Sequence, residues 1–211
     1  MRFMAVELKK LFTNKAFVLK IQAKLPKIFR ITEIECSRAG KIGMEVGSLR
    51  ERAVIALFIA QLGKEVVNTD IPITEPEADV IIYGKPVSIK TITANSGVKA
   101  VWTVDAQSAQ NFINNYKPKC DIILVHIFWG LEKGGFYFIP LDVQNEIFNK
   151  LGSAAYLQMP KPGTNPRGVE FSKDALKQLM MHKKTIIITI RWEKDAIDYD
   201  VYGRWVDYWK D

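Results

Sequence analysis

Two carboxylates and a lysine are spaced so that a β-hairpin and the helix before it could bring them together. Asp79 opens the strand-like run 79–83, and Ser88 and Lys90 lie two residues apart in the next run. Residues two apart in a strand share a face, so Lys90 is expected to face Asp79 across the hairpin. Glu51, near the start of an expected helix, could reach the same point.

This set of residues suits metal-assisted hydrolysis of a phosphodiester bond. Asp79 and Glu51 could hold a Mg²⁺, which prefers oxygen ligands and keeps several waters. The metal would lower the pKa of a bound water and neutralise charge that develops on the phosphate. The ammonium of Lys90 would orient or activate that water and add positive charge.

Each of the three residues also has an ordinary structural explanation. Ser48 and Glu51 fit a capping box, in which Glu51 would only bond the backbone of Ser48. Asp79 could be a turn residue at a strand end, and Lys90 a solvated surface residue. Each structural explanation is the better one for its residue alone. Because all three residues fit one metal site, the catalytic and structural interpretations are about evenly balanced on the residues alone.

The order of helix Glu, hairpin Asp, strand Lys, helix and buried strand resembles the PD-(D/E)xK nuclease superfamily. In that superfamily an Asp starts the second core strand, and an acid-x-Lys triplet lies on the third. The matching positions here are Glu51, Asp79 and the triplet 88–90, Ser-Ile-Lys. Two positions depart from the pattern, because Ala78 replaces a Pro and Ser88 replaces the second acid. The resemblance therefore implies that Glu51 supplies the second carboxylate.

Within that superfamily the chain resembles a type II restriction endonuclease that cuts CGCG to leave blunt ends. The resemblance implies a homodimer that acts on a palindromic DNA duplex, Mg²⁺ as the cofactor, and a companion DNA methyltransferase. Three alternatives stay open: a structure-directed repair or junction nuclease, a non-enzymatic basic DNA-binding module, and a protein of the membrane surface.

Three loops are candidates for DNA contact. Glycines 40, 43 and 47 precede the Glu51 helix and allow close approach of the backbone. Met44 in that loop could wedge between base pairs from the minor groove, although packing into the core or a dimer contact is commoner for a Met. The predicted contact residues are Arg38, Lys41, Met44, Arg50 and Arg52 around this loop, Asn95, Ser96 and Lys99 after Lys90, and Lys161, Asn165 and Arg167 in a Pro/Gly-rich loop.

The net charge of +7 arises in residues 1–30, which hold eight Lys or Arg and one Glu. Such a segment attracts phosphates of nucleic acid or of an anionic membrane surface. The same segment carries Phe12, Phe17 and Ile21 among other apolar residues that fit one helical stripe. A packed helix with a basic outer face accounts for both observations.

Periodicity and turn residues predict one α/β domain over 1–211, with a central mixed sheet flanked by helices. A helical region over 2–24 is expected to end at Pro26, and a helix capped by Ser48 is expected to end at Gly63. Further helices are predicted over 106–116, 141–151 and 172–181, and strands over 65–69, 79–83, 87–92, 122–129, 136–139, 185–192 and 199–205.

Composition excludes several classes of protein. The chain has 211 residues, 48% of them apolar, which is long and apolar enough for a full core. Two cysteines cannot form a disulfide framework and predict a reducing, cytoplasmic location. We expect no signal peptide or membrane span, because no apolar run approaches about 20 residues. Four of the five Trp follow residue 128, and we expect them in the core or a dimer interface.

Overall fold

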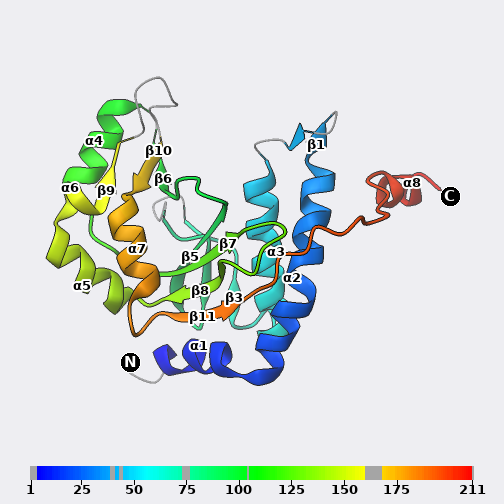
Figure 1. Ribbon diagram of the computed structural model, residues 1–211, viewed down its shortest axis with the longest axis horizontal. Helices are drawn as coiled ribbons and strands as arrows, with labels where there is room; N and C mark the ends of the chain where they lie inside the picture. The colour runs from blue at the N-terminus through cyan, green and yellow to red at the C-terminus, as the bar shows by residue number, and fades with distance from the viewer. Residues whose placement is uncertain are drawn as a thin grey trace.

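A six-stranded mixed sheet forms the centre of the protein (Figure 1). The computed structural model describes residues 4–38, 41–42, 45–72, 77–103, 105–159 and 168–210, apart from the side chains of residues 4–7 and 38. The order across the sheet is β11 (Ile186–Thr189), β8 (Gly135–Ile139), β7 (Asp121–Ile127), β5 (Lys85–Thr93), β4 (Val80–Ile82) and β3 (Val67–Asn68). Only β5 and β7 run parallel, and the other neighbours are antiparallel. The predicted α/β class with a mixed sheet is confirmed.

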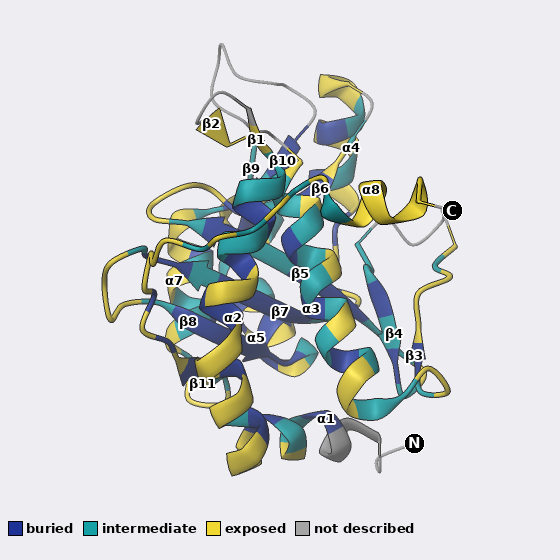
Figure 2. Cartoon of the chain, turned by 90° about the vertical axis from the view of Figure 1, so that its right-hand side faces the viewer, coloured by how far each residue is buried: buried dark blue, intermediate teal, exposed yellow. Residues whose placement is uncertain are grey.

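Both faces of the sheet are covered by helices, as Figures 1 and 2 show. In β7, Ile123 and Val125 enter one core and Ile122 and Leu124 enter the other. This alternation explains why the predicted central strand reads as a continuous apolar run. The first core is closed by α1 (Met4–Thr13), α2 (Lys15–Glu35) and α3 (Val46–Leu62), and the second by α4 (Ala106–Asn115), α5 (Leu141–Leu151), α6 (Ser153–Tyr156) and α7 (Lys173–Met181).

The hairpin of β4 and β5 turns at two residues with left-handed backbone. Tyr83 has φ of 51° and Gly84 has φ of 73°, and Ile82 pairs with Lys85 across the turn. Positive φ at both central positions is the turn geometry that matches the twist of paired strands. The predicted hairpin is confirmed, although the turn lies one residue earlier than expected and β5 is correspondingly longer.

Several short elements were not predicted from the sequence. A second sheet contains β6 (Lys99–Trp102), β10 (Gly168–Phe171) and β9 (Leu157–Gln158), and β1 (Ser37–Arg38) pairs with β2 (Lys41–Ile42). Strands of two to four residues are too short to show an alternating pattern. The strand predicted over 199–205 is wrong, because this segment leads into the short helix α8 (Gly203–Tyr208).

Helix α2 continues through Pro26 to Glu35, so the predicted end at this proline is wrong. A proline inside a helix removes one hydrogen bond and costs about 3 kcal/mol. Here the cost is offset by a buried stripe that includes Phe17, Ile21 and Phe29 on the same helix. Tertiary packing therefore overrides the local stop signal.

Helix α3 begins at Val46, so its N-cap lies three residues before the predicted cap at Ser48. The N-cap position is Glu45, and its side chain makes no capping hydrogen bond. Ser48 is inside the helix, so the capping box is absent and the structural explanation of Glu51 fails. The predicted stop is confirmed, because Gly63 caps the C-terminal end with φ of 89°.

The apolar side of the basic N-terminal segment packs against the sheet. Phe12 is 1% exposed, and its ring stacks on Phe138 of β8 with centroids 4.9 Å apart. A membrane-surface helix would need this apolar face to be exposed, so its burial argues against the membrane-surface alternative. Among the helices that the structure describes, none is long and apolar enough to span a membrane.

Truncation of Phe12 tests the contribution of this helix to stability. We expect Phe12→Ala to lower the free energy of unfolding by about 3 kcal/mol, because it leaves a cavity in the first core. Chemical denaturation measures this change. Exposed Lys10 on the same helix provides the control, since Lys10→Ala should change stability by less than about 0.5 kcal/mol. Equal stabilities for the two variants would contradict the packing of α1.

Candidate active site

The carboxylate of Asp79 lies where the ladder between β4 and β5 ends. The Asp79 amide donates to the Val87 carbonyl at 3.0 Å. Its Oδ2 then accepts hydrogen bonds from the Ile89 amide at 2.6 Å, the Ser88 hydroxyl at 3.2 Å and the Lys90 ammonium at 3.4 Å. Lys90 faces Asp79 across the hairpin, as the strand spacing predicts.

Ser88, which occupies the position where the sequence resemblance leads one to expect a second acid, donates to Asp79. Its side chain is buried, and its hydroxyl is one of the three donors that converge on Oδ2 of Asp79. Among the described residues the three donors converge on Oδ2, which leaves Oδ1 for another ligand. Ser88 therefore orients the carboxylate and brings no charge of its own.

Glu51 lies in the second turn of α3, close enough to Asp79 and Lys90 for their charges to act on it. Burial and, to a smaller extent, the charge of Asp79 raise the pKa of Glu51 to about 7, while the charge of Lys90 opposes the shift. A carboxylate that is partly desolvated beside another carboxylate favours its protonated form. The structure thus brings Glu51, Asp79 and Lys90 together.

The two carboxylates fit a hard divalent cation. Mg²⁺ is commonly bound through one or two carboxylates and retains several waters. A cage of three or more His, Cys, Asp or Glu is absent from the part of the chain that the structure describes. Among the described residues, Glu51 and Asp79 are two neighbouring carboxylates that could hold such an ion.

Two of the predicted DNA contacts, the buried Arg50 and the half-buried Lys99, form ion pairs within the protein. Arg50 is 4% exposed, and its guanidinium pairs with Glu33 and donates to the Thr93 hydroxyl at 3.0 Å. This placement does not fit the predicted DNA contact, because a buried and paired guanidinium cannot meet a phosphate. The ammonium of Lys99 pairs with Glu170 at 2.5 Å.

The other predicted contact residues fall into two groups. Four are exposed: Lys41, Arg52, Asn95 and Ser96. The rest lie outside what the structure describes: the side chain of Arg38, and residues Met44, Lys161, Asn165 and Arg167, together with Gly40 and Gly43. Gly47 is inside the first turn of α3.

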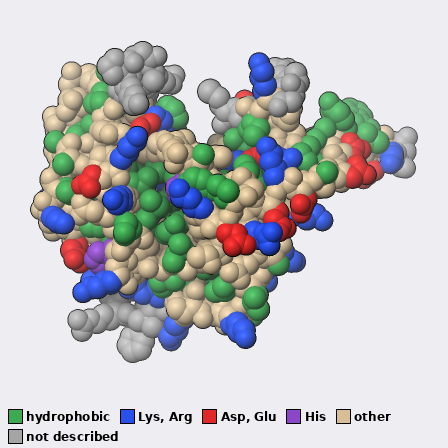
Figure 3. All heavy atoms as spheres, in the orientation of Figure 1, with side chains coloured by type: hydrophobic (Ala, Val, Ile, Leu, Met, Phe, Trp, Pro, Cys, Tyr) green, Lys and Arg blue, Asp and Glu red, His purple; other side chains and the backbone are tan. Residues whose placement is uncertain are grey.

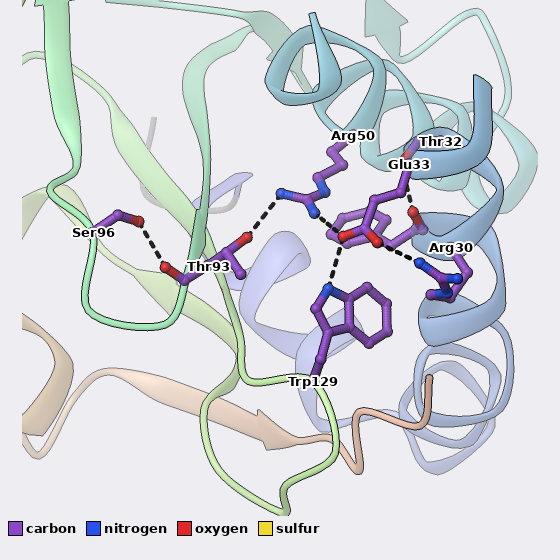
Figure 4. Close-up of polar contacts among 8 residues, drawn as sticks. Arg30, Thr32, Glu33, Arg50, Thr93, Ser96 and Trp129 are labelled. Carbon is purple, nitrogen blue, oxygen red and sulfur yellow. Dashed lines mark hydrogen bonds and ion pairs between the residues drawn. The ribbon is translucent and has the colours of Figure 1, made fainter. Parts of the chain in front are cut away.

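A buried polar cluster next to this site was missed in the sequence (Figure 4). Glu33 accepts from Arg30, Arg50 and the indole of Trp129. The sequence does not predict the role of Glu33, because its helix is expected to end at Pro26, and it predicts Trp129 only as a core or interface residue. A useful signal would have been the position of Glu33 on the stripe that continues from Phe29.

The mixed sheet flanked by helices, with an acid–lysine pair on its hairpin and a glutamate on the helix before it, defines a restriction-endonuclease type of nuclease core. A family model described as "Restriction endonuclease ThaI" matches residues 11–211, and the chain belongs to this family. A solved structure titled "Restriction endonuclease in complex with substrate DNA" is similar with a TM-score of 0.88 and 50% sequence identity. The similarity covers 96% of this chain and 98% of that chain. No curated protein matches the chain.

The protein is therefore a site-specific DNA endonuclease, and DNA is its partner. The fold and the family agree with the class predicted from Glu51, Asp79 and Lys90. They remove the reading of the chain as a non-enzymatic binding module.

Proposed function

We propose that the protein cuts both strands of DNA at CGCG and leaves blunt ends, with Glu51, Asp79 and Lys90 as its catalytic residues. The observation that carries the catalytic assignment is the convergence of the Lys90 ammonium and the Glu51 carboxyl on Asp79. The recognition sequence is proposed from the family resemblance. The DNA contacts proposed to hold the duplex are Lys41, Arg52, Asn95 and Ser96, with Arg38, Met44, Lys161, Asn165 and Arg167.

Restriction endonucleases generally use divalent metal ions. We propose Mg²⁺, held by Glu51 and Oδ1 of Asp79. When bound, such an ion lowers the pKa of a coordinated water and offsets charge on the phosphate. The Lys90 ammonium holds the attacking water in line and adds positive charge at the reacting phosphate. The Ile89 amide and Ser88 hydroxyl keep the Asp79 carboxylate in its orientation throughout.

We further propose a homodimer acting on a palindrome, in the cytoplasm, with a companion methyltransferase for the same site. A surface that supports a contact between proteins is the C-terminal arm, residues 199–210. Apart from Tyr199, which donates to Glu35, its aromatic side chains are exposed, and hydrophobic side chains gather on the protruding segment in Figure 3. The most exposed are Tyr202, Tyr208 and Trp209, at 71%, 85% and 88%. Large exposed aromatic patches are typical of interaction sites.

Digestion of a sequenced plasmid tests the proposed activity. With Mg²⁺ we expect discrete fragments whose sizes and blunt ends match cutting at CGCG, and with EDTA we expect none. Fragments that map to another sequence would overturn the recognition site. Selective cutting of branched DNA would favour the repair or junction nuclease. Intact plasmid with every divalent metal would reject the proposed active site.

A further inference from the structure

The carboxylate of Glu33 is buried and accepts three hydrogen bonds where α2, α3 and the turn after β7 meet. Glu33 is 2% exposed. Arg30 donates to its Oε2 at 2.7 Å, the Trp129 indole donates to its Oε1 at 2.7 Å, and Arg50 pairs with the same oxygen. Figure 4 shows the three donors converging on this one side chain.

A gain in stability does not by itself explain the buried ion pair of Glu33 and Arg50. Burying two charges costs several kcal/mol of solvation for each ion in order-of-magnitude terms, and apolar replacements of similar volume are often as stable. An ion pair of this kind can instead fix one arrangement of the elements that it joins.

The position of Arg50 in α3 couples it to Glu51. Adjacent residues of a helix project about 100° apart around its axis, since a turn contains about 3.6 residues. Arg50 points to α2 and the end of β5, while Glu51 lies within range of Asp79 and Lys90. The N-cap residue of α3 makes no side-chain hydrogen bond that would fix the start of the helix. The bonds of the Arg50 guanidinium to Glu33 and Thr93 therefore fix the rotation of the first two turns about the helix axis.

The same guanidinium is also bonded to the strand that carries Lys90. Arg50 donates to the hydroxyl of Thr93, the last residue of β5. The Thr93 carbonyl accepts from the Ser96 hydroxyl at 2.8 Å. The next residue, Ala94, has φ of 53°, and its amide donates to the Ile127 carbonyl of β7 at 2.8 Å. Thr93 is thus a fixed point at the ends of the two parallel strands.

We propose that Arg50 is a positioning residue that sets the place of Glu51 relative to Lys90. It does so by bonding at once to Glu33 on α2 and to Thr93 on β5. Active-site groups must be held within about 0.5 Å of their productive geometry, which requires supporting bonds of this kind. The inference rests on the proposed catalytic role of Glu51. In this proposal Arg50 supports the geometry of the active site and does not make the DNA contact that the sequence had predicted.

Thr93→Val and Arg50→Met test the proposal. Val has nearly the shape of Thr and removes only the hydroxyl acceptor. Since a misplacement of about 1 Å can cost about 100-fold in rate, we expect kcat to fall about 10-fold in Thr93→Val and about 100-fold in Arg50→Met. The KM for DNA should stay within about twofold of the natural protein, because no DNA contact is removed. Arg50→Lys, which keeps the charge but lacks the fork that reaches both acceptors, should recover kcat in part.

A second readout does not depend on cutting. Titration calorimetry of the protein with Ca²⁺ alone should show weaker binding in Thr93→Val and Arg50→Met. Val54 on the same helix is fully buried and lies in the first core, so Val54→Ala is the matched control. It should lower stability while leaving kcat and Ca²⁺ affinity unchanged. If Arg50→Met does not fold, Thr93→Val decides.

The outcomes separate this inference from the proposed function. Unchanged kcat and Ca²⁺ affinity in Thr93→Val would overturn the positioning role while leaving the endonuclease assignment intact. A rise in KM without loss of kcat in Arg50→Met would also overturn it, because Arg50 would then contact DNA. Full activity in Glu51→Gln would instead remove the proposed role of Glu51 on which the inference rests.

Discussion

Replacing Lys90 by Ala, or Asp79 by Asn, is expected to reduce DNA cutting at least about 1000-fold while DNA binding persists. Lys90→Ala removes a group that orients water and stabilises charge, and such groups contribute about 10² to 10⁴ in rate. Asp79→Asn retains an oxygen that can accept from the Ile89 amide and the Ser88 hydroxyl. It lacks the negative charge that a metal ion requires, so the fold is kept and the chemistry is lost.

Initial rates of plasmid cutting, with binding to a CGCG duplex measured by fluorescence anisotropy in Ca²⁺, check this prediction. Lys85 provides a matched control, because it is a lysine on the same strand that lies next to the hairpin turn and makes no hydrogen bond to Asp79 among the described residues. Lys85→Ala should cut within about twofold of the natural rate, as expected for a lysine outside the site. Natural rates in Lys90→Ala or Asp79→Asn would reject the hairpin as the catalytic element.

Glu51→Gln is expected to reduce cutting about 100-fold or more at limiting Mg²⁺ and to remove one pH dependence. The pKa of Glu51 is about 7, so below pH 7 its carboxyl increasingly holds a proton that a metal ion must displace. Metal affinity of the natural protein should therefore fall as the pH drops below about 7 and level off above it. Calorimetric titrations with Mg²⁺ at several pH values measure this profile, and a flat profile would contradict the role of Glu51.

The same shift predicts an effect on stability without metal. The folded protein holds the Glu51 proton up to about pH 7, whereas the unfolded chain releases it near the ordinary value of 4.5. The folded state thus binds more protons between these values, and its stability falls as the pH rises through this window. Glu51→Gln should lose this part of the dependence. Thermal unfolding in EDTA at pH 5 and pH 8 should therefore favour the variant at the higher pH.

Most of the site could be predicted from the spacing of Asp79 and Lys90 along the hairpin. Asp79 and Lys90 share a strand pair, and the period of two fixes which side chains face each other. The convergence of Glu51 on them followed from the order of the elements. Its raised pKa did not follow, because the burial of a side chain in the second turn of a helix depends on how the helix packs.

The errors arose where packing overrides local signals. Pro26 is a strong helix stop in isolation, yet buried contacts on both sides of it hold α2 together. Arg50 and Arg52 look equivalent in the sequence, but one is buried against Glu33 and the other is exposed. Which of the two arginines is buried depends on how α3 packs against α2, and the cap predicted for α3 lies three residues after the observed one.

The short strands could not be predicted for a different reason. A strand of two to four residues, such as β6 or β9, is stabilised by its partner and not by its own pattern. The segment 199–205 carries aromatic and β-branched residues that favour a strand, but the structure offers it no partner strand among the described residues. Without a partner strand to pair with, this preference does not produce a strand.

The hydrogen bond from the Ile89 amide to Asp79 makes the backbone of β5 a built-in reporter on the site. This amide bonds to a side-chain oxygen at 2.6 Å, where the ladder with β4 has just ended. Hydrogen bonds to charged acceptors are stronger than those to neutral ones. Any event that changes the charge or position of the Asp79 carboxylate will therefore change the chemical shift of the Ile89 amide proton. The state of the candidate catalytic carboxylate can thus be followed in the nuclear magnetic resonance spectrum of the protein, with no added probe.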